Sequence, residues 1–374
     1  MGKQKEPLVR LARREAMPLW QSVPVRLAAI LLALIVCGVF IFSITHSNPL
    51  AVYESLAAGA LGTGRRTWNT VRDTMILLAI ALGITPAFKM RFWNIGAEGQ
   101  ILVGGIATAA CMRYLGASLP APLLFAVIIA SSLICGMIWG LIPAFFKAHW
   151  DTNETLFTLM MNYIAIQLCA FFSIVWEAKK GSGTIGIINQ KTQSGWITTK
   201  FLPEVFGNFN YSINLIIVTA MTVLMFIYLK YTKHGYEITV VGESENTARY
   251  AGIRVRRVIL RTMALSGAIC GFTGFLLVSG SSHTISTSTA GGRGFTAIIV
   301  SWLAHFNPFV MVLISFFLVF MGNGSTQIAS DYGLNESASE VITGILLFFI
   351  LGSEFFVNYR LVFAHSRRRE EVSA

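Results

Sequence analysis

A glycine-rich segment at the start of an apolar run carries the side chains best suited to bind a polar solute. It reads Asn94-Ile-Gly-Ala-Glu-Gly-Gln100 and follows Trp93. Charged side chains at membrane depth are costly and persist mostly where they face an aqueous path or a partner, and glycines let a helix break so that freed backbone groups can meet a solute. A competing interpretation is an interfacial loop in which Glu98 caps the following helix. The candidates for a solute pathway in this segment are Trp93, Asn94, Gly96, Glu98 and Gln100.

A second glycine-rich break opens a later apolar run. It reads Ser288-Thr-Ala-Gly-Gly-Arg-Gly-Phe295, and Trp302 follows two helical turns later. Breaks at corresponding positions of two halves are typical of transporters in which paired broken helices flank the solute. We therefore add Arg293, Phe295 and Trp302 to the candidate pathway. A glycine-rich turn with Arg293 at the lipid headgroups is the alternative.

Two asparagines mark a third apolar run, which starts at Thr155. Asn153 precedes the run and is predicted to be its N-cap, since its side chain can accept from a free backbone N–H. Asn162 follows about two turns into the run and is predicted to face the bundle interior or the pathway. A polar side chain that only joins neighbouring helices is the alternative for Asn162.

The connection at residues 230–257 contains a very short predicted helix between Ser244 and Gly252. Ser244 is the predicted N-cap and Gly252 the predicted C-terminal stop. A helix of about two turns is too short to be stable alone, so it must dock on something unless it is only a solvated loop helix. The candidate residues for contact with a cytoplasmic partner are Gly242, Glu243, Ser244, Glu245, Asn246, Ala248, Arg249, Tyr250 and Gly252.

Enzymatic signatures are not found in the sequence. It has no G-x-S-x-G, no H-E-x-x-H and no phosphate-binding loop G-x-x-x-x-G-K-[ST], and its six histidines are scattered without ligand spacing. The five cysteines lie in apolar runs and read as small buried hydrophobic residues. We therefore expect no catalytic residue, no metal and no cofactor in this chain. Energy for active transport would come from an ion gradient or from another subunit.

The elements that position these residues are membrane-spanning helices. Of 374 residues, 54% are hydrophobic and only 13% are charged, which leaves too little polar surface for a soluble protein. The net charge of +11 is explained by Lys and Arg in cytoplasmic loops rather than by nucleic-acid binding. About ten apolar runs are long enough to be considered as spans, namely Leu27–Ile44, Asp73–Phe88, Gly99–Leu115, Leu119–Phe146, Thr155–Trp176, Tyr211–Leu229, Val258–Gly280, Phe295–Phe306, Pro308–Ile328 and Glu340–Val357.

This pattern predicts an all-α, multi-pass membrane protein with both termini in the cytoplasm. We expect a cytoplasmic tail at residues 1–26, a transmembrane domain at 27–358 and a basic cytoplasmic tail at 359–374. Most of the 29 Lys and Arg then fall on the cytoplasmic side, as the positive-inside rule requires. Five spans in each half would have opposite orientations, which is consistent with a 5+5 inverted repeat.

Taken together and in order, these motifs resemble permease subunits of bacterial ABC importers. The resemblance is to the branch of ribose and branched-chain amino acid permeases, closest to permeases for nucleosides and simple sugars, and covers residues 70–355. Two departures from the usual pattern are Trp93 and the pair Ser301-Trp302. The segments that carry the resemblance are Asn94–Gln100, Asn153-Glu154, Met161-Asn-Tyr163, Gly242-Glu243, Ala248-Arg-Tyr-Ala-Gly252 and Gly291-Gly-Arg-Gly-Phe-Thr-Ala297.

The resemblance implies a type II importer fold in the bacterial plasma membrane, carrying nucleosides or a related simple-sugar-like solute inward by alternating access. It implies four kinds of partner: cytosolic ATPase subunits that hold ATP and Mg²⁺, a second permease of the same or a different chain, an extracytoplasmic substrate-binding lipoprotein, and membrane lipid. It also implies that Ser244–Gly252 is the coupling helix that contacts the ATPase. The alternative is a secondary transporter driven by an ion gradient, with Asp73, Glu98 or Glu340 as the ion site.

Overall fold

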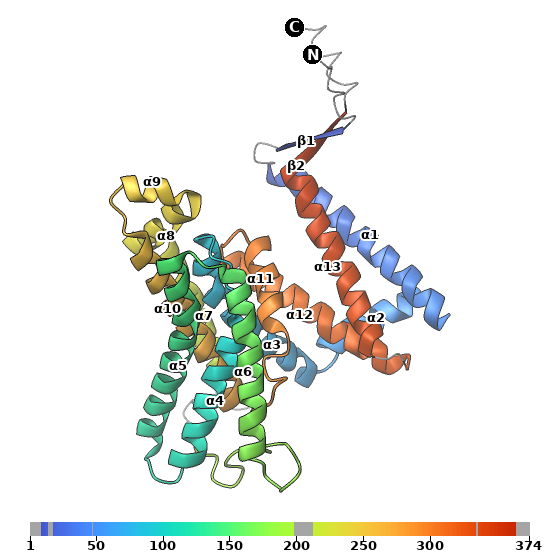
Figure 1. Cartoon of the computed structure of the whole chain (residues 1–374). Coiled ribbons are helices and arrows are strands. Elements are labelled where there is room, and N and C mark those ends of the chain that lie inside the picture. Colours follow the sequence, from blue (N-terminus) through green and yellow to red (C-terminus); the bar gives the residue numbers. More distant parts are fainter. Residues whose placement is uncertain (1–8, 14–17, 47, 198–211, 334–335, 364–374) are drawn as a thin grey trace. The chain divides into compact units, whose positions relative to one another are not determined.

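Helices make up nearly all of the computed structural model, which describes residues 9–13, 18–46, 48–197, 212–333 and 336–363. Contacts divide the chain into two compact units, one formed by residues 67–319 and the other by residues 1–66 and 320–374. Figure 1 shows the elements. They are β1 (Val9–Arg13), α1 (Leu19–Thr45), α2 (Pro49–Leu61), α3 (Gly64–Lys89), α4 (Ala97–Leu115), α5 (Ala121–Trp150), α6 (Glu154–Val175), α7 (Ser212–Tyr231), α8 (Lys233–Glu243), α9 (Glu245–Tyr250), α10 (Val255–Leu277), the π-helical η3 (Val278–Ser282), α11 (Arg293–Leu303), α12 (Pro308–Asp331), α13 (Glu336–Asn358) and β2 (Tyr359–Phe363).

Eight of the described helices are long and apolar enough to cross a membrane, and all eight were expected from the sequence. They are α1, α3, α5, α6, α7, α10 with η3, α12 and α13. The expected span at Gly99–Leu115 is α4, whose 19 residues reach about 28 Å but include Glu98, Gln100 and Arg113. Most of α4 is buried against α5, α6 and α10, so neighbouring helices rather than lipid surround Glu98 and Gln100, while Arg113 is exposed in the last turn of the helix.

The expected span at Phe295–Phe306 corresponds to α11, which is too short to cross a membrane as a helix by itself. Helix α11 has 11 residues and reaches about 17 Å, whereas the hydrocarbon core is about 30 Å thick. The chain nevertheless passes from one end of the bundle to the other between residues 283 and 303. His283 O accepts from Ile188 N in the α6–α7 loop, while Trp302 stacks on Trp93 beyond the other end of α3. Non-helical chain at residues 283–292 and the short helix α11 together cover this distance, and irregular backbone at membrane depth is tolerated only beside protein or a water-filled space.

Helices α5 and α10 cross at glycines spaced four residues apart. Gly136 and Gly140 on α5 face Gly267 and Gly271 on α10, and a Cβ at Gly271 would lie 2.8 Å from Gly136 Cα. Small residues at this spacing let helix backbones approach closely in a membrane. The four-residue spacing of these glycines can be seen in the sequence, but the contact between α5 and α10 was not predicted from it. It brings α10 beside α5 and α4, the helix that carries Glu98.

The second unit pairs α1 with α13 and adds a short antiparallel strand pair. The strands run at residues 9–13 and 359–363, with Val9 opposite Phe363 and Arg13 opposite Tyr359. Helix α1 begins at Leu19, so the expected tail at 1–26 is partly helix and strand. The remainder of that tail, residues 1–8 and 14–17, and residues 364–374 of the expected C-terminal tail lie outside the described residues, as do residues 198–211 between α6 and α7. The strand pairing brings the two terminal segments side by side.

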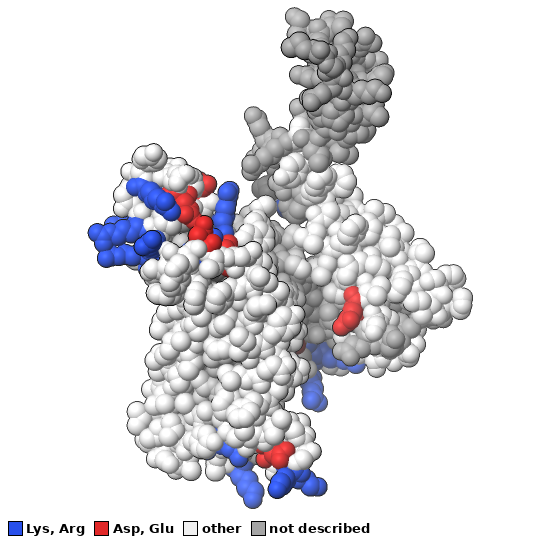
Figure 2. All heavy atoms as spheres, viewed as in Figure 1, with Lys and Arg blue, Asp and Glu red and all other residues white. Residues whose placement is uncertain are grey.

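Charged side chains of the unit at residues 67–319 gather at the two ends of its helices. Figure 2 shows Lys, Arg, Asp and Glu over the end formed by α8 and α9 and again at the opposite end, with an almost uncharged surface between them. An uncharged band bounded by charged ends is the surface that a bilayer requires. Together with the eight long apolar helices, this band makes the chain a multi-pass membrane protein.

Candidate functional site

The two glycine-rich breaks meet at the carboxylate of Glu98. Its Oε1 accepts from Gly292 N at 2.7 Å, and its Oε2 accepts from Gly294 N at 2.9 Å. Glu98 lies in the first turn of α4 and is 7% exposed, and the two amides belong to the N-terminal end of α11. Free N–H groups and the helix dipole favour a negative charge at such ends. Glu98 therefore caps a helix 194 residues away rather than only its own helix.

A second set of polar side chains, the amides of Asn94 and Gln100, stabilises the first glycine-rich break. Asn94 Oδ1 accepts from Gly96 N at 3.1 Å and from Gln100 Nε2 at 3.2 Å. Asn94 Nδ2 donates to Ser266 Oγ on α10 at 3.1 Å. Asn94 and Gln100 are almost completely buried. Because their hydrogen bonds are made within the protein, these two amides hold the break in shape and face no open cavity.

Asn162 joins α6 to the same break by two backbone hydrogen bonds. Its Oδ1 accepts from Gly99 N and its Nδ2 donates to Ile95 O, both at 2.8 Å. Thr158, one turn earlier on α6, accepts from Ile95 N at 3.2 Å. Asn162 is buried, as expected, and it satisfies backbone groups that the broken helix leaves free. Thr158 has the same role and was not identified from the sequence, since a lone threonine in an apolar run carries no signal.

An aromatic pair lies beside the break and links it to the last turn of α11. Trp93 and Trp302 stack with ring centroids 5.8 Å apart and an interplanar angle of 27°. Phe88 contacts both rings edge-on. The two tryptophans are 45% and 43% exposed, and Phe295 on the same face of α11 is 47% exposed. Of the predicted pathway residues beside the two breaks, these three aromatics are the most exposed; Arg293 is 33% exposed, and Asn153 is exposed at the start of α6.

Arg293 lies at the start of α11 and faces Asp73 of α3. The distance from Arg293 Nη2 to Asp73 Oδ1 is 3.5 Å, and Arg72 Nη2 contacts the same oxygen at 3.0 Å. This ion pair ties the second break to α3, so Arg293 has a protein partner. Asp73, considered above as an ion site, is neutralised by two guanidinium groups.

The short helix expected in the 230–257 connection is present as α9. Ser244 Oγ accepts from Thr247 N at 3.3 Å and is the N-cap, while Gly252 has φ +75° and ends the segment. Arg249 pairs with Glu245 at 3.3 Å, and Tyr250 is 94% exposed. Helix α8 precedes α9 and was missed, because its charged, amphipathic sequence resembles a loop. Asn153 is likewise the N-cap of α6, accepting from Leu156 N at 3.1 Å.

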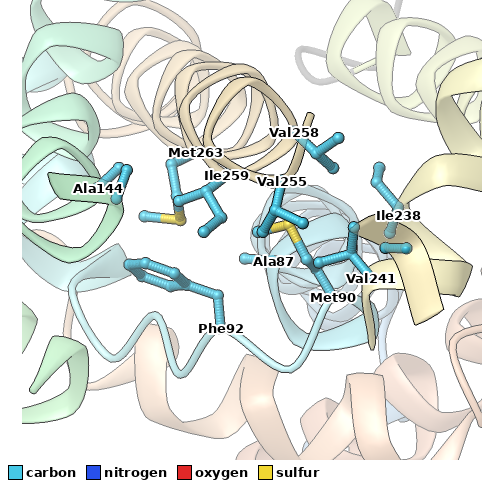
Figure 3. Packing of buried hydrophobic residues seen from close by; sticks show 12 residues of the cluster. Ala87, Met90, Phe92, Ala144, Ile238, Val241, Val255, Val258, Ile259 and Met263 are labelled. Carbon is cyan, nitrogen blue, oxygen red and sulfur yellow. The ribbon is translucent and has the colours of Figure 1, made fainter. Parts of the chain in front are cut away.

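One side of α9 is buried in an apolar cluster that also holds the chain between α3 and α4 (Figure 3). Ala248 is the buried residue of α9, and it shares this cluster with Met90 and Phe92. Gly242, the penultimate residue of α8, lies so close to the same chain that its Cβ would be 3.2 Å from Met90 Cα. The remaining members come from α3, α5, α8 and α10, namely Ala87, Ala144, Ala148, Ile238, Val241, Val255, Val258, Ile259 and Met263.

The other side of α9 borders an open hollow of about 810 Å³. Asp151 at its edge is paired with Lys147 at 2.7 Å, and this ion pair holds the pKa of the Asp151 carboxyl below its usual range. Positive charges outnumber negative ones along the wall. The charged lining residues are Lys147, Asp151, Glu245, Arg249, Arg254, Arg256 and Arg257.

The predicted residues therefore form two groups in the unit of residues 67–319. Glu98, Arg293, Trp93 and Trp302 come together where α4, α11 and α3 meet, and the α9 residues form a separate group beyond Met90. Asn153 belongs to neither group, since it only caps α6. Within the described part of the chain, no three His, Cys, Asp or Glu side chains are arranged to hold a metal ion.

Comparison with known proteins identifies the family. The family described as "Branched-chain amino acid transport system / permease component" matches residues 67–351. A glucose ABC transporter permease protein, TsgB13 of Haloferax volcanii, is 26% identical over 98% of this chain and 97% of its own. The guanosine ABC transporter permease protein NupP of Bacillus subtilis is 25% identical over 88% and 93%, and the nucleoside ABC transporter permease protein NupB of Lactococcus lactis is 27% identical over 81% and 84%. The chain belongs to this family of ABC transporter permeases, which are transport components and whose ATPase is a separate subunit.

Proposed function

We propose that this permease carries nucleosides inward across the bacterial plasma membrane, with its N- and C-termini in the cytoplasm. The observation that carries the substrate class is the Trp93–Trp302 pair, whose accessible indole faces can stack on a nucleobase. Stacking of a base on an aromatic ring contributes about 1–3 kcal/mol per base. The guanosine and nucleoside permeases among the relatives support the same class.

Simple sugars are the second candidate, because the relative that covers nearly the whole chain is a glucose permease. A sugar ring also stacks on tryptophan through its C–H faces but gains less from a flat aromatic partner. Ligand binding by the protein that delivers the solute to the permease is the most direct test between nucleosides and simple sugars. We expect nucleosides to raise the unfolding temperature of the cognate extracytoplasmic binding protein, since a ligand that binds only the folded state stabilises it. Protection by glucose or amino acids alone would contradict the nucleoside assignment.

The partners follow from the same proposal. Two permeases, of one or two kinds, would assemble with two cytosolic ATPases that bind ATP and Mg²⁺ and with the binding protein, all surrounded by lipid. The α9 residues from Gly242 to Gly252 would contact the ATPase through the exposed side that carries Arg249 and Tyr250.

The docking role of α9 is tested by reversing one charge. Arg249→Glu places a second carboxylate beside Glu245 and should weaken both copurification of the ATPase and ATP-dependent uptake. Lys233→Glu makes the same charge change on the preceding helix, outside the proposed contact, and should assemble normally. If Arg249→Glu supports assembly and uptake at the native level, α9 is not the docking helix.

A further inference from the structure

Helix α11 is attached at both ends to the chain around the α3–α4 connection. We define the α3–α4 link as residues 90–96. At one end of α11, Gly292 N and Gly294 N donate to Glu98, which lies in the first turn of α4, two residues beyond the link. At the other end, Trp302 stacks on Trp93 of the link, and the adjoining Ser301 Oγ lies 2.9 Å from Thr85 Oγ1 on α3. The link therefore lies between the two attachments, one of which it makes itself through Trp93, while the other is made by the helix turn that directly follows it.

The same link also lies against the helices that would contact the ATPase. Met90 and Phe92 share the buried cluster with Ala248 of α9 and with Val241 of α8 (Figure 3). A Cβ at Gly242 would lie 2.2 Å from Lys89 O and 3.2 Å from Met90 Cα, so no side chain fits between α8 and the start of the link. Buried packing of this density does not deform continuously, so displacement of α8 and α9 is passed to the link.

We propose that the α3–α4 link transmits movement of α9 to α11, and that Glu98 is the positioning residue that keeps the N-terminal end of α11 attached to it. The inference rests on the proposed ATP-driven transport. We choose α11 as the element that moves for two reasons. It carries the accessible rings of Phe295 and Trp302. It also follows non-helical chain, whose backbone angles can change at low cost. In this mechanism Glu98 contacts no solute, and its carboxylate acts through backbone N–H groups.

The close approach at Gly294 supports the role assigned to Glu98. A Cβ at this position would lie 2.7 Å from Glu98 Oε2 and 2.9 Å from Glu98 N. Glycine is therefore needed for the amide to reach the carboxylate. Arg293, between the two donating glycines, is held separately by Asp73, which fixes the orientation of the amides.

The test measures whether α11 still responds to nucleotide when Glu98 is changed. A Thr296→Cys reporter is placed on α11 in a chain whose five native cysteines are replaced, and the permease is assembled with its ATPase in proteoliposomes. The rate of maleimide modification is compared without nucleotide and with ATP plus vanadate. We expect the rate to change by about fivefold or more in the reporter chain and by less than about twofold after Glu98→Ala. Glu98→Ala should retain ATP hydrolysis and lose uptake by about tenfold or more.

Glu177→Ala is the matched control. Glu177 also accepts from two glycine amides, Gly181 N and Gly183 N, but these lie in its own loop at the far end of the bundle. This variant should keep both the nucleotide response and ATP hydrolysis. If it loses the response as Glu98→Ala does, the effect is general destabilisation and the inference is overturned.

A conservative variant covers the case in which Glu98→Ala does not assemble. The side chain of Glu98→Gln has the same shape but accepts through one oxygen, so uptake should fall about fivefold with a smaller nucleotide response. A native response in either Glu98 variant would overturn the inference. The maleimide measurement needs no solute, so failure of the reporter chain to take up nucleosides would count against the proposed substrate alone.

Discussion

Replacing Gly271 by alanine should drive α5 and α10 apart. The new Cβ would lie 2.3 Å from Ser132 O, 2.8 Å from Gly136 Cα and 3.2 Å from Gly136 N. Carbon atoms in favourable contact are about 3.5–4.0 Å apart, so the contact with Gly136 Cα alone requires the backbones to separate by roughly 0.7 Å or more. All three atoms belong to the backbone, so the strain cannot be relieved by a rotamer change.

Overpacking of this kind costs about 1–3 kcal/mol. For a unit of the size of residues 67–319, each kcal/mol lowers the unfolding temperature by about 2–4 °C. We therefore expect the unfolding temperature to fall by roughly 2–12 °C. The assay is thermal unfolding of the detergent-purified chain followed with a thiol-reactive dye, because Cys270 is fully buried on α10 and reacts only when the helices separate.

Gly352→Ala is the control for the intrinsic effect of the substitution. A Cβ at this position in α13 meets nothing within 4 Å, and alanine is the better helix former. Its unfolding temperature should equal or exceed that of the native chain. If Gly271→Ala were as stable as Gly352→Ala, the close crossing of α5 and α10 would be refuted.

Four further substitutions test other contacts. Trp302→Ala and Trp93→Ala should each raise the KM for nucleoside uptake by about tenfold, since loss of one stacking face costs about 1–3 kcal/mol. Glucose uptake should change less. Equal effects on both solutes would show that the tryptophan pair does not select the substrate. Asn162→Leu leaves Gly99 N and Ile95 O without this partner, at a cost of about 1–3 kcal/mol each, so the unfolding temperature of the variant should fall. An unchanged unfolding temperature would mean that these two groups find other partners. Ser244→Ala removes the α9 cap at a cost of about 1 kcal/mol, which should speed amide hydrogen exchange in α9, and unchanged exchange would mean that packing alone holds this helix.

Local features of the fold were predictable because they depend on neighbouring residues. The caps at Asn153 and Ser244 and eight of the spans follow from side chains within one or two turns. The contact between Glu98 and the start of α11 was not predictable, because 194 residues separate the partners and one sequence records only that both segments are rich in glycine. Helix α11 was expected to be a span although it has only 11 residues, because hydropathy reports burial and not the length of the helix.

The hydrogen bonds of Glu98 and Asp73 argue against two of the three carboxylates considered from the sequence as ion sites. A carboxylate that serves as a proton or sodium site must be free to exchange its partners during transport. Both oxygens of Glu98 are already bound by backbone amides of α11, and an ion could enter only by detaching that helix. Asp73 is held by two arginines. With these two carboxylates bound by the protein, the proposed movement of α11 is better explained by work done on the exposed side of α9, which contacts the link through the buried cluster.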